Sequence, residues 1–290
     1  MDAFQQMLNV VGNNIANENT TAFKASNVEF SDIMNQTLNL GSAGQGTATA
    51  PGNPGGTNPQ QVGLGVQVSQ IYKDFTQGAM NITGNPNNLA ISGNGFFLVS
   101  TNPAPTKMSD LYFTRAGDFS VDSNGNLVTP NGYYLLGIKG TTAPTLSTQA
   151  TGTGDPSITL NSLTSINVNN TSNVASSFSV GTNGIVTVTG GNTYYIPLAT
   201  VENPNGLLDV GNNLYAPNSY SNPVEGTITY DVANDTTNGV GSITQGALEA
   251  SNVDLTKEMS NMIVAQTGYE ANSKVINTVN QMNQFMIQQV

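Results

Sequence analysis

The chain has 290 residues, enough for one or two domains with a real hydrophobic core, and no apolar run approaches the length of a membrane span. Only 9% of the residues are charged, and 7 Lys plus Arg against 18 Asp plus Glu give a net charge of −11, which repels phosphate backbones and excludes nucleic acid as a partner. Because the chain has no Cys and no His, disulfides, thiolate chemistry, a Ser-His-Asp triad and zinc sites are excluded as well.

A helix is predicted at the start of the chain, from residue 1 to about residue 17. Its apolar residues recur at steps of three and four, which is the spacing of one helix face. The pattern stops in Asn-rich sequence at Asn17, so the helix is expected to end there. The apolar residues are Phe4, Met7, Leu8, Val11 and Ile15.

The next segment, residues 31–61, is predicted to be a flexible connector. From residue 40 onward it is a low-complexity sequence of Gly, Pro, Asn, Thr and Ala. Such a composition cannot bury enough apolar surface to order itself.

An all-β core domain is predicted from two stretches, residues 62–140 and 178–250. Apolar residues alternate with Gly and Gln at the beginning of the first stretch, and short apolar runs separated by turn residues follow. Residues 112–136 predict successive hairpins, because their Asn-Gly pairs supply the positive φ that tight turns require. Between the two stretches, residues 141–177 are rich in Thr, Ser and Asn and predict a loop-rich insertion or a small lobe.

A long helix is predicted at the end of the chain, over residues 251–290. Ser251 is expected to cap its N-terminus, and Asp254 and Glu258 are expected to place negative charge at the positive end of the helix dipole. A second apolar line lies beside the main one, so this helix is expected to have partners on two sides. The main apolar line consists of Leu255, Met259, Met262, Ile263, Tyr269, Ile276, Val279, Met282 and Met286.

The two terminal helices determine the predicted fold class, which is α+β. A mainly-β middle domain of short strands and hairpins is inserted between the long N- and C-terminal helices. Neither helix has an apolar neighbour in the adjoining sequence, so we expect them to pair as a coiled-coil-like terminal domain of residues 1–30 and 251–290. The alternative is a two-helix cap on the main domain. The apolar residues named above on both helices form the predicted axial assembly interface.

No catalytic, cofactor-binding or metal site is predicted, and the chain is not expected to be an enzyme. Asp118 and Asp122 flank a predicted hairpin and are interpreted as turn formers rather than as a catalytic pair. Residues 122–126 resemble a calcium loop only faintly, since the bidentate Glu is missing, and a hairpin turn is predicted instead. Arg115 is expected to pair with Asp118.

Several sequence motifs occur in the order found in one known family. The sequence resembles the bacterial flagellar axial proteins, the hook and rod subunits, over nearly its whole length. It departs from the family at Ala22, where Gly is common, and members usually have further helical residues before the position of Met1. The matching segments are Asn13–Asn17 with Thr20–Lys24, Asn85–Phe97, Phe113–Phe119, Leu198–Leu207 with Gly211–Tyr215, and Gln245–Ile276.

The resemblance implies a structural protein that assembles with copies of itself. Residues 55–65 and the Tyr269–Asn272 motif are more similar to hook subunits, so a subunit of the hook is the first hypothesis: a curved tube that transmits torque from the rod to the filament. A distal rod subunit is the alternative, favoured by the small or missing outer domain. A secreted carbohydrate-binding or adhesive β protein is a remote third hypothesis, because such proteins are also rich in Asn and Thr.

The resemblance also implies the partners and the location of the protein. Besides further copies of the chain, the expected partners are the distal rod protein, the hook–filament junction protein, the hook cap and the type III export apparatus. The protein is then expected in the extracellular part of the flagellum. Export by the type III pathway agrees with the lack of a cleavable signal peptide in the sequence.

Overall fold

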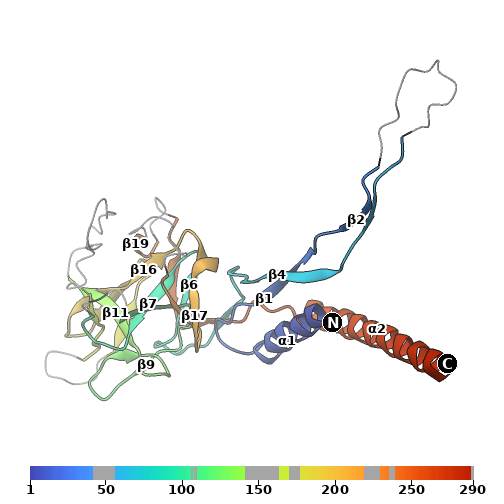
Figure 1. The fold of residues 1–290 in the computed structure, drawn as a ribbon. Coiled ribbons are helices and arrows are strands. Elements are labelled where there is room, and N and C mark those ends of the chain that lie inside the picture. The colour runs from blue at the N-terminus through green and yellow to red at the C-terminus, as the bar shows by residue number, and fades with distance from the viewer. Residues whose placement is uncertain are drawn as a thin grey trace. The chain divides into compact units, whose positions relative to one another are not determined.

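The structure of the protein is a computed structural model, and it describes residues 1–41, 56–105, 107, 110–140, 163–169, 177–218, 229–234 and 239–288. Within these residues one α-helix lies near each end of the chain, and most of the other regular elements are strands (Figure 1). The chain is therefore a mixed protein in which β-structure predominates.

The chain divides into two compact units, each built from separate stretches of sequence. The first unit contains Met1–Ile15, Ser26–Tyr72 and Leu255–Val290, and the second contains Ala16–Ala25 and Lys73–Asp254. The first unit thus holds more than the two predicted helices, because the strands between Ser26 and Tyr72 belong to it as well.

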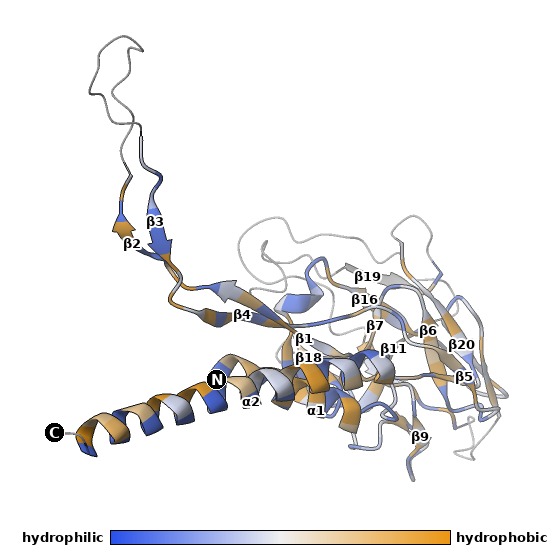
Figure 2. Ribbon diagram, turned by 90° about the vertical axis from the view of Figure 1, so that its right-hand side faces the viewer, coloured by the Kyte–Doolittle hydropathy of each residue, from blue (hydrophilic) through white to orange (hydrophobic). Residues whose placement is uncertain are grey.

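The helices of the first unit are α1 (Asp2–Ala16) and α2 (Leu255–Gln288). They contact each other where the ring of Phe4 lies against Gly268: a Cβ added to Gly268 would be 2.7 Å from two of the ring atoms. The N-terminus lies beside the middle of α2, and α2 continues beyond it (Figures 1 and 2). Asn14, which is buried, joins α1 to the following strand by donating to Ser26 O at 2.8 Å and accepting from Ser26 N at 2.9 Å.

The start of α2 differs from the prediction. The helix begins at Leu255 rather than after a cap at Ser251, whose hydroxyl accepts a hydrogen bond from Val253 N at 3.3 Å. Residues 251–254 stay outside the helix because the side chain of Asn252 binds backbone groups of other segments, at Ala25 N and Asp74 O. Glu258 lies in the first turn as predicted, and it is buried.

Strands occur where a flexible connector was predicted, which corrects that prediction for the described part of residues 31–61. β1 (Ser26–Asp32) pairs with β4 (Val66–Lys73), and β2 (Gln36–Asn39) pairs antiparallel with β3 (Gln60–Val62). The two ladders follow each other along an extended ribbon (Figures 1 and 2). Each strand finds its partner on the far side of the low-complexity stretch, and local sequence patterns do not show such pairing. Residues 42–55 lie outside the described residues.

The strands of the second unit are short. Among the described residues, 13 of them join one sheet, in which β13, β14, β15, β11, β7, β8, β18 and β17 follow one another. Two further pairs, β20 with β6 and β21 with β5, are antiparallel ladders of their own. A short 3₁₀ helix covers Pro204–Gly206. The strands are β5 (Met80–Ile82), β6 (Leu89–Ser92), β7 (Phe96–Ser100), β8 (Leu111–Thr114), β9 (Ser120–Val121), β10 (Leu127–Val128), β11 (Tyr134–Lys139), β12 (Leu163–Ser165), β13 (Phe178–Val180), β14 (Ile185–Val188), β15 (Thr193–Tyr195), β16 (Pro197–Thr200), β17 (Leu208–Gly211), β18 (Leu214–Ala216), β19 (Thr229–Val232), β20 (Ser242–Gln245) and β21 (Ala247–Glu249).

β7 lies at the centre of the large sheet and is buried along its whole length. It pairs antiparallel with β8, β11 and β16. Its side chains alternate between two hydrophobic clusters: Phe97 and Val99 pack in one, and Phe96 and Leu98 in the other. Both faces of the strand are therefore covered, which explains why its sequence is a continuous apolar run rather than an alternating one.

The turn between β9 and β10 is the predicted hairpin and not a calcium loop. Asp122 Oδ1 accepts hydrogen bonds from Asn124 N at 2.8 Å and Asn126 N at 2.7 Å, and Gly125 has a φ of +85°. Leu127 is paired with Val121 across the turn. The carboxylate thus binds backbone N–H groups of its own turn.

The predicted hairpins between residues 120 and 136 are present, because β9 pairs with β10 and β10 pairs with β11, whereas β8 pairs with β7 and β18. Several strands were not predicted, among them β17, β20 and β21, since each is only three or four residues long. Most of the predicted lobe at residues 141–177 lies outside the described residues, and β12 is the strand described within it.

A buried group of charges in the second unit corrects the predicted partner of Arg115. The guanidinium of Arg115 lies 3.3 Å from Glu249 Oε2 and donates hydrogen bonds to Gly93 O and Gly95 O. It does not pair with Asp118. Lys24 Nζ lies 2.6 Å from Glu249 Oε1. Burial lowers the pKa of Lys24, and the neighbouring carboxylate opposes that shift. Two buried cations thus share one buried carboxylate, an arrangement that requires all three side chains.

Ala22 is buried and has a φ of +56°, in the left-handed region. Its N–H donates to Glu249 O at 2.8 Å. A glycine adopts this conformation without steric cost, which explains why the resembling family commonly has Gly at this position.

Candidate assembly interface

The last half of α2 carries an exposed apolar face. From Val275 to Gln288 the helix contains no charged residue. Ile276 is 48% exposed, Met282 63% and Ile287 76%. At about 100° per residue the exposed apolar residues other than Phe285 gather on one side of the helix. We call this set the α2 face: Val275, Ile276, Val279, Met282, Met286 and Ile287.

The structure divides the predicted interface residues of α2 into two groups. Leu255 and Met262, in the first half of the helix, are half-buried. The others are exposed, and those from residue 276 onward lie on the α2 face. The exposed group is Met259, Ile263, Tyr269, Ile276, Val279, Met282 and Met286.

The predicted interface residues of α1 are less accessible. Val11 is buried, and Phe4, Met7, Leu8 and Ile15 are half-buried. The contact between Phe4 and Gly268 shows that part of this apolar surface is already used within the chain.

Four exposed apolar residues of α2 were not among the predicted interface residues. Val264, Val275, Phe285 and Ile287 are all 58% exposed or more. Ile287 follows Ile276 by three full helical turns, so an extension of the helical period would have identified it.

A second exposed apolar surface lies on the ribbon of the first unit. Its strands have few buried positions on either side, in contrast to the strands of the second unit. Met34 and Leu40 are each 85% exposed. The ribbon surface consists of Phe30, Met34, Leu38, Leu40, Val62, Leu64, Val66, Ile71 and Tyr72.

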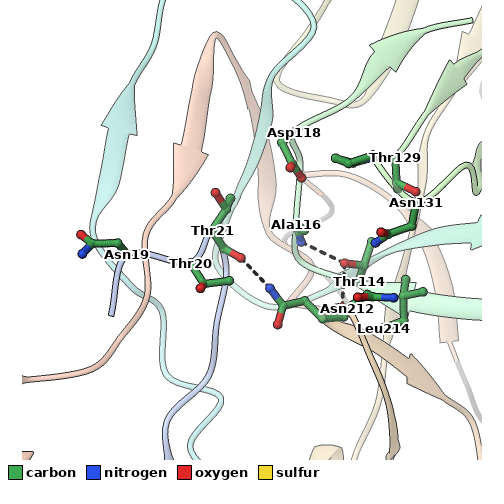
Figure 3. Close-up of a pocket in the computed structure, with 12 residues that line it drawn as sticks. Asn19, Thr20, Thr21, Thr114, Ala116, Asp118, Thr129, Asn131, Asn212 and Leu214 are labelled. Atoms are coloured by element: carbon green, nitrogen blue, oxygen red, sulfur yellow. Dashed lines mark hydrogen bonds between the residues drawn. The ribbon is translucent and has the colours of Figure 1, made fainter. Parts of the chain in front are cut away.

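The second unit contains a polar hollow of about 380 Å³, shown in Figure 3. Thr114 Oγ1 donates to Asn213 O at 2.9 Å, and Asn213 Nδ2 donates to Thr21 O at 2.8 Å. Burial raises the pKa of Asp118, which also lines the hollow. None of the lining residues is aromatic, so the hollow lacks the apolar walls of a typical small-molecule site. They are Asn19, Thr20, Thr21, Thr114, Ala116, Asp118, Thr129, Pro130, Asn131, Asn212, Asn213 and Leu214.

The described part of the chain shows no metal-binding cluster of three or more His, Cys, Asp or Glu side chains. Neither of its two helices is long and apolar enough to cross a membrane. The exposed apolar surfaces of the first unit are thus the features that most need a partner.

Three family models match the chain in order. Residues 1–24 match the flagella basal body rod protein family, residues 90–188 the D1 domain of the flagellar hook protein FlgE/F/G, and residues 244–289 the C-terminal region of the flagellar basal body rod FlgEFG proteins. The two terminal matches include all of α1 and all of α2, and the central match includes β7, β8 and β11.

Similar proteins of known name fall into two groups. The flagellar basal-body rod protein FlgG of Bacillus subtilis (strain 168) is 36% identical over 293 residues, covering 99% of this chain and 94% of the relative. FlgG of Agrobacterium fabrum is 34% identical, covering 97% and 93%. The flagellar hook protein FlgE of Helicobacter mustelae is 45% identical over 139 residues, covering 47% of this chain and 28% of the relative. The chain therefore belongs to the family of flagellar basal-body rod and hook proteins.

Proposed function

We propose that this chain is a subunit of the distal flagellar rod, which assembles with further copies of itself through its terminal helices. The observation that carries the proposal is the extent of similarity. Proteins named as basal-body rod proteins match the chain over 93% or more of their own length, whereas the hook protein of H. mustelae matches over 28%. A rod subunit is thus supported better than the hook subunit that the sequence motifs suggested.

The α2 face supports assembly between copies. It is apolar, exposed and free of charged neighbours from Val275 to Gln288, so a partner covers it at little desolvation cost. A contact between different surfaces of identical subunits, repeated without closing, produces a helical filament. A rod requires this kind of contact.

The ribbon surface supplies a second region for contact with neighbouring copies. The ribbon consists of two-stranded ladders, formed by β1 with β4 and by β2 with β3. A two-stranded ladder buries few of its own side chains. Covering the ribbon surface in the assembled rod would bury apolar area that is exposed in the single chain.

A hook subunit remains the second candidate, favoured by the 45% identity to FlgE over about half of the chain. Under either candidate, the other axial proteins and the type III export apparatus are the expected partners, and the flagellum is the expected location. We do not propose a carbohydrate-binding protein, since the polar hollow has no aromatic wall.

Deletion of the gene separates the two candidates. Electron microscopy of basal bodies purified from the deletion strain should show truncated rods without hooks. Complete rods that lack only the hook would refute the rod proposal and support the hook candidate. As a control, the wild-type gene supplied in trans should restore full-length rods.

An epitope inserted after Ser123 gives an independent test. This residue lies in the exposed turn between β9 and β10, so the insertion should leave the sheet intact. Gold-labelled antibody should mark the rod and not the hook on broken basal bodies. Label along the curved hook would contradict the proposal.

A further inference from the structure

Three short segments of the second unit, residues 24–25, 74–76 and 249–252, meet near the places where the chain passes from one unit to the other. The second unit runs to Ala25, resumes at Lys73 and ends at Asp254. Ala25, Asp74 and Asn252 lie at or within two residues of these places, and they are hydrogen-bonded to one another. We call the group around them the Asn252 cluster: Lys24, Ala25, Asp74, Thr76, Glu249 and Asn252.

One side chain connects the three segments. Asn252 Oδ1 accepts from Ala25 N at 2.8 Å, while its Nδ2 donates to Asp74 O at 2.7 Å and to Thr76 O at 3.2 Å. Asp74 N donates to Ala25 O at 2.8 Å, which closes the triangle. Only an amide offers a donor and an acceptor together in this way, and an aspartate could not donate to the two carbonyls.

The buried charges connect the same three segments a second time. Lys24 Nζ donates to Thr76 O at 2.7 Å and to Glu249 Oε1 at 2.6 Å. Gly78 N also donates to Glu249 Oε1, at 2.9 Å. The contacts of the cluster are made by polar groups, and its six residues belong to neither of the two hydrophobic clusters of the sheet. Phe75, between Asp74 and Thr76, packs against one of these clusters, and Arg115 shares the carboxylate of Glu249.

We propose that Asn252 is a positioning residue whose cluster opens and closes as one unit before the large sheet unfolds. When closed, it fixes the residues that precede β1 and α2 and the residues that follow β4. Opening breaks hydrogen bonds and the Lys24 ion pair and releases Phe75 from the edge of the sheet's core, but the strands of the large sheet stay paired, so it requires less than global unfolding. The inference stands whether or not the chain is a rod subunit.

Limited trypsin digestion of the purified full chain tests the proposal. The chain has only 7 Lys plus Arg residues, so each cleavage is identified by mass. The bonds after Lys24 and Lys73 lead into Ala25 and Asp74, whose N–H groups make cluster hydrogen bonds. In Asn252→Ala we expect cleavage at both bonds to accelerate together, by at least about tenfold, with cleavage after Lys139, at the exposed end of β11 in the sheet, unchanged.

Asn167→Ala is the matched control. The side chain of Asn167 also donates twice, to Asn124 O and Asn126 Oδ1, and accepts once, from Asn169 N, but it lies elsewhere in the second unit. This variant should leave cleavage after Lys24 and Lys73 unchanged. Equal acceleration at Lys139 in Asn252→Ala, or no acceleration at Lys24, would overturn the proposal.

The wild-type chain provides a second test if Asn252→Ala fails to fold. In low concentrations of urea, cleavage after Lys24 and after Lys73 should rise with the same urea dependence, and before cleavage after Lys139 does. Different dependences at the two bonds would mean that the cluster does not open as a unit, and the proposal would be wrong.

Discussion

Glu249 is the residue on which the buried charges of the second unit converge. Its carboxylate receives Lys24 Nζ at 2.6 Å, Gly78 N at 2.9 Å and Arg115 Nη1 at 3.3 Å, and its side chain is fully buried. Nothing in the sequence near Glu249 indicates this role, because its partners are far away in the chain. Glu249 matters for stability mainly because its loss would leave the buried charges of Lys24 and Arg115 unpaired.

We expect Glu249→Gln to destabilise the second unit by about 3–5 kcal/mol, since it leaves two buried cations without a counter-charge. Urea unfolding followed by circular dichroism measures the effect. Glu202→Gln, at an exposed position, is the control and should change stability by less than about 0.5 kcal/mol. Equal, small effects of the two substitutions would show that the ion pairs do not contribute as described.

Asp118 and Asp122 should respond oppositely to pH. Burial raises the pKa of Asp118, so its carboxyl binds a proton more tightly in the folded chain. Its contribution to stability is therefore present below the pKa of the unfolded chain and is lost as the pH rises through the folded pKa. Asp118→Asn should raise the urea midpoint at pH 7, and the difference from wild type should vanish below about pH 4.

Asp122 provides the comparison of opposite sign. Burial acts to raise its pKa, but hydrogen bonds from Asn126, Asn124 and Gly125 prevail and lower it. Its contribution to stability is present above the unfolded pKa and is lost as the pH falls through the folded pKa. Asp122→Asn should thus lower the urea midpoint at pH 7 but not in acid. Shifts of the same sign for both variants at pH 7 would contradict this account.

At the scale of elements, the chain uses strands of two kinds. β7 is buried on both faces and belongs to the sheet of the second unit, whereas β2 and β3 are exposed along their whole length. The two helices differ as well, because α1 has buried residues along its length, while the buried residues of α2 lie at its start. The exposed elements are those that assembly can cover.

Two helix glycines test the contact between α1 and α2. Gly12 has open space around it, so Gly12→Ala should stabilise its helix by about 1 kcal/mol. Gly268→Ala gains the same helix propensity, but the new Cβ must displace the ring of Phe4. We expect Gly268→Ala to be less stable than Gly12→Ala by at least about 1 kcal/mol in thermal unfolding monitored by far-ultraviolet circular dichroism.

The double variant Phe4→Ala with Gly268→Ala identifies the cause. Without the ring, the Gly268→Ala substitution should no longer be penalised relative to Gly12→Ala. A penalty that persists in the Phe4→Ala background would have another origin than this contact.

At the scale of the whole molecule, the exposed apolar surfaces mean that the single chain is incomplete. The α2 face and the ribbon surface together hold most of the large apolar side chains that remain exposed. Soluble proteins rarely leave such continuous apolar surface uncovered unless it binds a partner. Membership of the rod and hook family supports the proposal that a neighbouring subunit covers this surface.

Ile276→Asp should prevent assembly without destabilising the single chain. Ile276 is 48% exposed, so the aspartate stays hydrated in the monomer, but covering it in a filament would cost several kcal/mol. Sedimentation and electron microscopy should show monomers where the wild type forms filaments, and cells with this variant should not swim.

Gln281→Asp is the control for this experiment. Gln281 is exposed on the side of α2 opposite the centre of the α2 face, so the same charge there should permit assembly. If Ile276→Asp formed filaments of normal stability, the α2 face would be solvent-exposed in the filament, and the assembly proposal would be wrong.

Much of the fold could be predicted because the information is local. The helical spacing of apolar residues predicted α1 and most of α2, and Asp122 with its Asn-Gly turn predicted the β9–β10 hairpin. The motifs placed the chain among the flagellar axial proteins, to which its relatives also belong. These inferences depend on backbone propensity and on side-chain type, which neighbouring residues in the sequence determine.

The tertiary structure decided what depends on distant residues. Arg115 pairs with Glu249 rather than with the nearby Asp118, and α2 starts at Leu255 because Asn252 is bound to Ala25 and Asp74. The ribbon strands pair across the low-complexity stretch, and tertiary contacts cover part of the first half of α2 but leave the α2 face exposed. Strand pairing and burial depend on which distant segments meet in the folded chain. A local pattern of residues does not specify these contacts.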